Sequence, residues 1–113
     1  MEDPHIVLMV LNWGNPIACA SYRLFDEKSV EIRRVYVKKR YRNRKIAYKL
    51  VKALEKLAME NNFRYSYIET GKDNIAAINL YKKLGYETID NFGFFKDDEL
   101  CLCMRKEFKT LIF

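Results

Sequence analysis

The stretch VYVKKRYRNRKIAYKL, from Val35 to Leu50, carries seven Lys and Arg residues between a strand-like apolar run and a helix-like apolar run. This much positive charge at a strand-to-helix turn has three interpretations: a solvated helix face, a patch for nucleic acid, or a cradle for a phosphorylated ligand. Backbone N–H groups at the start of a helix have no partners inside the helix and attract anions. The turn is therefore a candidate phosphate site.

The positive charge is local. Residues 31–52 hold ten basic residues and one acidic residue, so this stretch carries +9, while the whole chain carries +6 and the rest therefore sums to −3. Basic residues that bind nucleic acid are more often dispersed over the chain or placed in a tail, so this local distribution disfavours nucleic acid as the partner.

Length and composition predict one domain, residues 1–113, with a modest core. No run reaches the roughly 18 uncharged apolar residues that cross a membrane. The start, MEDPHIVLMVLNWG, is acidic before it is apolar, unlike a signal peptide. We therefore expect a cytoplasmic protein that does not contact a membrane.

Cysteine and histidine usage argues against several kinds of site. Cys19, Cys101 and Cys103 form no C-x-x-C pair, and we interpret them as reduced thiols. His5 is the only histidine. These counts disfavour a Cys–His nucleophile, a Ser-His-Asp triad and a His-rich metal site, and we predict no metal.

Hydrophobic periodicity and turn residues predict the order β-β-β-α-β-α-β-β, an α/β layout. The predicted strands are His5–Leu11, Ile17–Phe25, Ser29–Val37, Phe63–Thr70, Tyr86–Phe95 and Leu100–Phe108, and the predicted helices are Arg44–Glu60 and Asn74–Leu84. We expect Asn43 to cap the first helix and Gly85 to end the second.

The third predicted strand changes its alternation partway along. Val30 and Ile32 are apolar at even positions, whereas Val35 and Val37 are apolar at odd positions. One extra residue near 33–34 would restore the period of two, so we predict a β-bulge there.

Two motifs suggest a family. V-x-x-x-x-R-x-x-K-I-A, residues 37–47, resembles the acetyl-CoA signature Arg/Gln-x-x-Gly-x-Gly/Ala of the GNAT N-acetyltransferase superfamily, with Arg42, Lys45 and Ala47 at its three fixed positions. The motif N-x-x-A-x-x-L-Y-x-x-L-G-Y, residues 74–86, resembles the second, more specific half of that signature. With the tail YETIDNFGFF…LCLCMRKEF, the resemblance runs from about residue 15 to residue 108.

The resemblance implies an α/β fold with a mixed, bulged GNAT-like sheet flanked by helices. Only about 14 residues precede Asn15, so most of the family's first strand and two helices is expected to be lacking. The implied activity is direct transfer of an acetyl group from acetyl-CoA to a primary amine in a ternary complex. The acceptor would be a small molecule or a peptide.

The resemblance also implies roles for individual residues. The bulged strand would pair with the pantetheine arm of the donor, backbone amides of the turn would bind the pyrophosphate, and Asn74 would contact the donor further along. Tyr81 would protonate the leaving thiolate, and Glu31 would deprotonate the amine through water. The donor-binding residues are Val35, Tyr36, Val37, Arg42, Asn43, Arg44, Lys45, Ile46, Ala47 and Asn74. Tyr81 as a core tyrosine and Glu31 as a paired strand carboxylate remain open alternatives.

The chain departs from the family at two glycine positions, which here are Asn43 and Lys45. We expect Lys45 to keep helical torsions and to offer its ammonium to a phosphate. Two other functions stay open: a CoA-binding fold with weak turnover, and a basic nucleic-acid-binding module. The apolar late strands, one of them expected at a sheet edge, are compatible with a homodimer.

Overall fold

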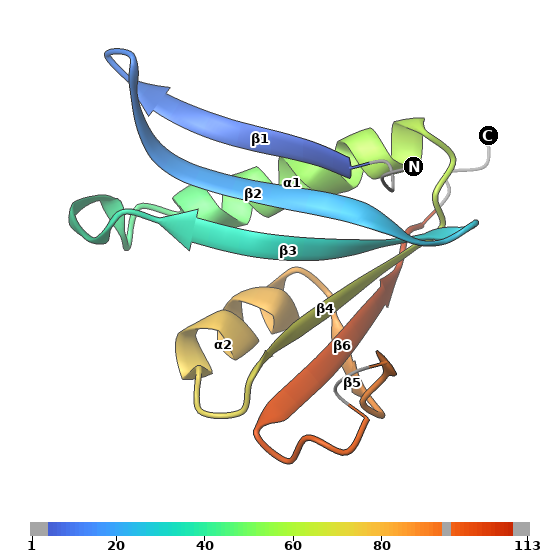
Figure 1. Cartoon of the computed structure of the whole chain (residues 1–113). Coiled ribbons are helices and arrows are strands. Elements are labelled where there is room, and N and C mark those ends of the chain that lie inside the picture. The colour runs from blue at the N-terminus through green and yellow to red at the C-terminus, as the bar shows by residue number, and fades with distance from the viewer. Residues whose placement is uncertain (1–4, 94–95, 110–113) are drawn as a thin grey trace.

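The computed structural model describes residues 5–93 and 96–109, which form a mixed sheet with two α-helices (Figure 1). The predicted order of elements is confirmed over these residues. The strands are β1 (His5–Asn12), β2 (Asn15–Asp26), β3 (Ser29–Val37), β4 (Tyr65–Gly71), β5 (Glu87–Ile89) and β6 (Cys101–Glu107). The helices are the short 3₁₀ turn η1 (Lys39–Tyr41), α1 (Ile46–Glu60) and α2 (Ile75–Lys83).

The strands follow the spatial order β1-β2-β3-β4-β6-β5. Strand β3 pairs with β4 in parallel, and every other neighbouring pair is antiparallel. The parallel step follows from the crossover through α1, whereas the tight turn Trp13–Gly14, with both φ angles positive, joins β1 and β2 as a hairpin.

Most predicted element ends differ from the observed ones by one or two residues, and the start of the first helix and the length of β5 differ in ways that matter for the fold. Helix α1 begins at Ile46 rather than Arg44, and its N-cap is Lys45 rather than Asn43. The reason is backbone geometry: Asn43 and Lys45 both have positive φ angles, 65° and 61°, which a right-handed helix excludes. Strand β5 has only three residues, and Phe95, its predicted end, lies outside the described residues.

The predicted bulge in β3 is confirmed. The register between β2 and β3 shifts between Cys19 and Ser21, and Arg34 in the opposite strand has φ of 55°. Ser21 Oγ donates to the Arg33 carbonyl at 3.1 Å, which fixes the chain just before the extra residue. The bulge turns the second half of β3 away from its regular course.

The sheet is split between β3 and β4. The two strands pair only where Ser29–Ile32 lies against Tyr65–Ile68, although both continue further. Beyond that segment they diverge, and Figure 1 shows a wedge between β1–β3 and the half formed by β4, β6, β5 and α2. The split leaves backbone N–H and C=O groups of β3 without a strand partner on that side.

The main core lies between the sheet and α1. Val30 and Ile68 of the paired segment pack with Val51 and Leu54 of α1, and all four are almost fully buried. The other face of the sheet carries Phe25, Tyr67 and Phe92, whose rings contact one another. No helix in residues 5–93 and 96–109 is both long enough and apolar enough to span a membrane.

Candidate functional site

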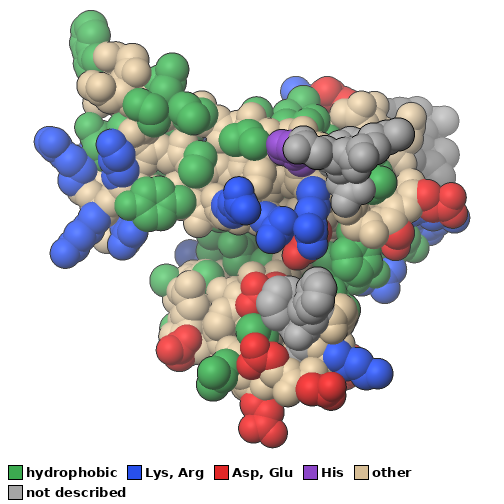
Figure 2. Space-filling view, viewed as in Figure 1, with side chains coloured by type: hydrophobic (Ala, Val, Ile, Leu, Met, Phe, Trp, Pro, Cys, Tyr) green, Lys and Arg blue, Asp and Glu red, His purple; other side chains and the backbone are tan. Residues whose placement is uncertain are grey.

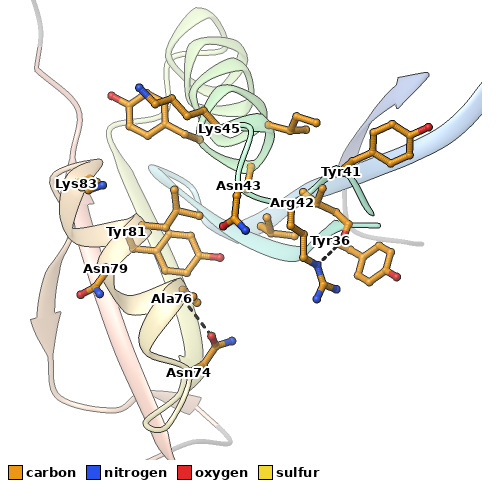
Figure 3. A pocket seen from close by; sticks show the side chains of 17 residues that line it. Tyr36, Tyr41, Arg42, Asn43, Lys45, Asn74, Ala76, Asn79, Tyr81 and Lys83 are labelled. Carbon is orange, nitrogen blue, oxygen red and sulfur yellow. Dashed lines mark hydrogen bonds between the residues drawn. The ribbon is translucent and has the colours of Figure 1, made fainter. Parts of the chain in front are cut away.

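A pocket of about 770 Å³ lies at the open end of the wedge. The end of β3, the turn before α1, the first turn of α1 and one side of α2 line it (Figure 3). Nine of the ten residues predicted to bind the donor are among the lining residues; they are Val35, Tyr36, Val37, Arg42, Asn43, Lys45, Ile46, Ala47 and Asn74. The structure thus brings together segments that the sequence separates by about 40 positions.

The turn between β3 and α1 is held by its own hydrogen bonds. The Lys38 N–H donates to the Ile17 carbonyl at 2.8 Å, and Arg42 Nε donates to the Val37 carbonyl at 2.9 Å. The Arg42 guanidinium also lies over the Tyr36 ring, 5.8 Å from its centroid. These contacts fold the turn back onto β3 and bring its cations to the pocket mouth.

Lys45 takes a left-handed conformation, with φ of 61° and ψ of 19°. The expectation that it keeps helical torsions is wrong. Its carbonyl accepts the first helical hydrogen bond, from the Lys49 N–H at 3.1 Å, so the left-handed residue sets the direction in which α1 departs. Glycine takes this conformation without a steric penalty, which explains why glycine suits the position better than most residues.

The start of α1 has no side-chain cap. The backbone N–H groups of its first turn, which have no partner inside the helix, therefore receive no side-chain cap either, and Ile46 and Ala47 of that turn line the pocket. Figure 2 shows Lys and Arg side chains gathered where β3 meets η1, and Asp and Glu side chains gathered over the half with β5 and β6. Uncapped amides, helix dipole and local positive charge together favour an anion in the pocket.

Arg44 is the one predicted donor-binding residue that does not line the pocket. Its guanidinium lies over the Tyr41 ring at 5.5 Å from the centroid, and Arg40 lies at the same distance from that ring. Tyr41 itself lines the pocket and accepts a hydrogen bond from Asn12 Nδ2 at 3.1 Å. The β1–β2 hairpin is thereby joined to the basic turn.

Asn74 and Tyr81 form the α2 wall. Asn74 caps α2, because its Oδ1 accepts from the Ala77 N–H at 3.2 Å, which leaves its amide NH₂ for a ligand. Tyr81 is only 6% exposed, and its hydroxyl points into the pocket (Figure 3). Burial and, second, the charge of Glu69 raise the pKa of Tyr81 to about 12. Its hydroxyl is therefore protonated at neutral pH.

Glu31 is placed differently from the other predicted residues. It is buried on β3, and its Oε1 accepts from Arg23 Nε at 3.0 Å, the paired arrangement left open from the sequence. It is not among the pocket-lining residues. Glu69, which was not predicted from the sequence, is also outside the pocket lining. It lies on β4 directly after the last residue paired with β3 and interacts electrostatically with Tyr81.

Further pocket residues on α2 were not predicted from the sequence. Ala76, Asn79 and Lys83 line the pocket together with Asn74 and Tyr81. Helical spacing could have found them, because residues three and four apart share a helix face. Within residues 5–93 and 96–109, no group of three or more His, Cys, Asp and Glu side chains is arranged to hold a metal ion.

Comparison with known proteins points to one family. The sequence profile described as "Acetyltransferase (GNAT) family" matches residues 1–86. An uncharacterized N-acetyltransferase from Dictyostelium discoideum is 35% identical over 65 residues, which are 58% of this chain and 30% of that protein. The chain therefore aligns with less than two thirds of this curated relative.

Solved structures give the same fold. A Klebsiella pneumoniae protein assigned as an acyl-CoA N-acyltransferase superposes with a TM-score of 0.86 at 32% identity, covering 91% of this chain and 72% of that one. A GNAT family acetyltransferase from Elizabethkingia anophelis, solved with acetyl-CoA bound, gives a TM-score of 0.80 at 21% identity, covering 90% and 75%.

Proposed function

Because the chain belongs to the acetyltransferase (GNAT) family, we propose that it transfers an acetyl group from acetyl-CoA to a primary amine. The observation that carries the proposal is the pocket at the sheet split, where an unpaired strand, an uncapped helix start and a buried tyrosine meet. Each of these features matches one part of the donor: the amide-bearing arm, the pyrophosphate and the sulfur.

The donor would bind along the wedge. The pyrophosphate accepts hydrogen bonds from first-turn amides of α1, with Arg42 and Lys45 supplying charge. The pantetheine arm pairs with β3 beyond Ile32, where β4 no longer occupies the strand edge. The arm then runs past Asn74 toward Tyr81. The acetyl-CoA bound by the structural relative from Elizabethkingia anophelis supports this choice of donor.

The reaction is a single displacement. A neutral amine nitrogen attacks the thioester carbonyl carbon, a C–N bond forms, and the C–S bond breaks. The proton lost by nitrogen goes to a carboxylate, and the leaving thiolate takes the hydroxyl proton of Tyr81. A backbone N–H of β3 that the bulge frees stabilises the oxyanion, and holding both reactants in one wedge supplies proximity.

Two carboxylates, Glu31 and Glu69, compete for the role of base, and both lie outside the pocket lining. Glu31 has a side chain only 7% exposed, and Arg23 already occupies one of its oxygens. If Glu31 acts, it acts through a water, as the family resemblance implies. Glu69 is partly exposed, accepts a hydrogen bond from the Cys101 thiol and acts electrostatically on Tyr81, which makes it the second candidate.

The two carboxylates are separated by parallel substitutions. Glu31→Gln and Glu69→Gln are compared in kcat/KM over pH 5 to 9, with the exposed Glu87→Gln as the control. The variant that lacks the catalytic base loses the fall in kcat/KM at low pH, whereas the other variant keeps the shape of the pH profile and changes only the size of kcat/KM. If both retain that fall, neither carboxylate is the base. The acceptors for this assay come from a panel of polyamines, amino acids, aminoglycosides and peptides, screened by release of free thiol.

Donor binding is tested before turnover. CoA, ADP and a short oligonucleotide are compared at equal concentration in thermal unfolding. CoA at 100 times its Kd is expected to stabilise the fold by about 2.7 kcal/mol. Stabilisation by the oligonucleotide without stabilisation by CoA would instead support the nucleic-acid module. CoA binding without thiol release across the panel would support a CoA-binding fold that lacks turnover.

A further inference from the structure

A buried carboxylate lies outside the pocket, in the middle of α1. Glu55 is 1% exposed, yet it is fully partnered. Lys106 Nζ donates to both of its oxygens at 3.0 and 3.1 Å, and the Tyr86 hydroxyl donates to Oε2 at 2.9 Å. The same hydroxyl shares a second hydrogen bond, 2.7 Å long, with Ser66 Oγ. We call these four residues the Glu55 cluster.

The Glu55 cluster joins the two halves of the wedge. Glu55 belongs to α1, which packs on β1–β3, whereas Ser66 lies on β4 and Lys106 on β6. Tyr86 lies between α2 and β5. Strand pairing between β3 and β4 covers four residue pairs, those of Ser29–Ile32. The cluster therefore adds directional contacts beside a short seam, and such contacts set the angle at which the halves diverge.

The cluster also reaches the α2 wall of the pocket. The Tyr86 ring packs edge-on against the Tyr81 ring, with centroids 5.9 Å apart, and the Tyr86 N–H donates to the Tyr81 carbonyl at 2.9 Å. Burial and the neighbouring Glu55 carboxylate raise the pKa of Tyr86, which keeps its hydroxyl a donor. A shift of Tyr86 would thus move Tyr81 as well.

A buried ion pair is poor evidence for stability, because well-packed apolar side chains can replace it with little loss. What a fully satisfied buried network does provide is one defined arrangement of the elements it joins. We infer that Glu55 and Tyr86 are positioning residues that fix the width of the slot between β3 and α2 in which the pantetheine arm would lie. This inference rests on the proposed function.

The test compares a ligand that has the arm with one that lacks it. CoA and ADP are titrated by calorimetry into the wild-type chain and into Tyr86→Phe, which keeps the ring but removes the hydroxyl. ADP affinity is expected to stay within about twofold of wild type, and CoA affinity to fall by roughly fivefold. A role in stability alone would lower the melting temperature without separating the two ligands.

Glu55→Gln is the second variant, and Glu107→Gln is its matched control, because Glu107 forms an exposed ion pair with Arg64 at 2.9 Å. The control is expected to bind both ligands as wild type does. If Glu55→Gln does not fold, Tyr86→Phe decides alone. Unchanged CoA affinity in Tyr86→Phe, or an equal loss for CoA and ADP, overturns the inference and leaves the proposed function standing. Failure of the wild-type chain to bind CoA overturns both.

Discussion

The left-handed conformation of Lys45 predicts that glycine is more stable than alanine at position 45, whereas alanine is more stable than glycine at a nearby helical position. A left-handed residue with a Cβ carries about 1–2 kcal/mol of steric strain, which glycine avoids. Glycine also destabilises the fold by roughly 0.4–1 kcal/mol, because it raises the conformational entropy of the unfolded chain. With φ of 61° at this position, Lys45→Gly should therefore be more stable than Lys45→Ala by about 1 kcal/mol.

Lys49 is the matched control, because it is exposed and lies inside α1, four residues further on. There the backbone is helical, so Lys49→Gly should be less stable than Lys49→Ala by about 1 kcal/mol. Both pairs remove one lysine charge, so charge cancels in each comparison. The order of glycine and alanine should reverse between the two positions.

The assay is thermal and urea unfolding followed by far-ultraviolet circular dichroism. An entropy of unfolding of about 2.1 cal/mol/K per residue makes 1 kcal/mol equal to a shift of roughly 4 °C in Tm for a chain of this length. Lys45→Ala as stable as Lys45→Gly would refute the argument, because the backbone at position 45 would then not be left-handed in solution.

Three further predictions follow from the pocket. Asn74→Ala should lose about 1 kcal/mol of unfolding free energy with the helix cap, whereas Asn74→Asp keeps the cap; if the two melt together, the cap bond to Ala77 is not formed. Arg42→Ala should weaken CoA binding at least tenfold by titration calorimetry, since it removes a charge-assisted contact worth about 1.5–3 kcal/mol; equal affinity would place the pyrophosphate elsewhere. Tyr81→Phe should change the pH dependence of stability. The pKa of Tyr81 is raised to about 12 in the folded chain and is near 10 in the unfolded chain. The protonated hydroxyl therefore contributes stability that is fully present below about pH 10 and is lost as pH rises toward 12. Urea unfolding from pH 9 to 11.5 should show a slope reduced by up to about 1.4 kcal/mol per pH unit in the variant, and an unchanged slope would mean that Tyr81 is solvated.

Much of the fold could be predicted because alternation and helical spacing are local signals. The bulge at Arg34 could also be predicted from local alternation, because a change from even to odd apolar positions within one strand has few other causes. The start of α1 could not be predicted from the sequence. Its position depends on left-handed torsions at Asn43 and Lys45, which are residues that also occur freely in helices.

The parts of the candidate site that lie within one sequence motif were predicted. The contacts between side chains of different strands and helices were not. Nine of the residues predicted to bind the donor line one pocket because they come from two short segments. The ion pair of Glu31 with Arg23 and the action of Glu69 on Tyr81 depend on strand register and on the split between β3 and β4. Periodicity sets which face a residue takes, but not which neighbour it meets there.

The tip of the first hairpin has a practical consequence for spectroscopy. Trp13 is the only tryptophan in the sequence, and it is 96% exposed at that tip. Its emission should therefore resemble that of free indole in water whether the chain is folded or not, and it would be a poor monitor of denaturation. Its neighbour Asn12 donates a hydrogen bond to Tyr41, which lines the pocket, so a single side-chain contact connects the hairpin tip to the pocket rim.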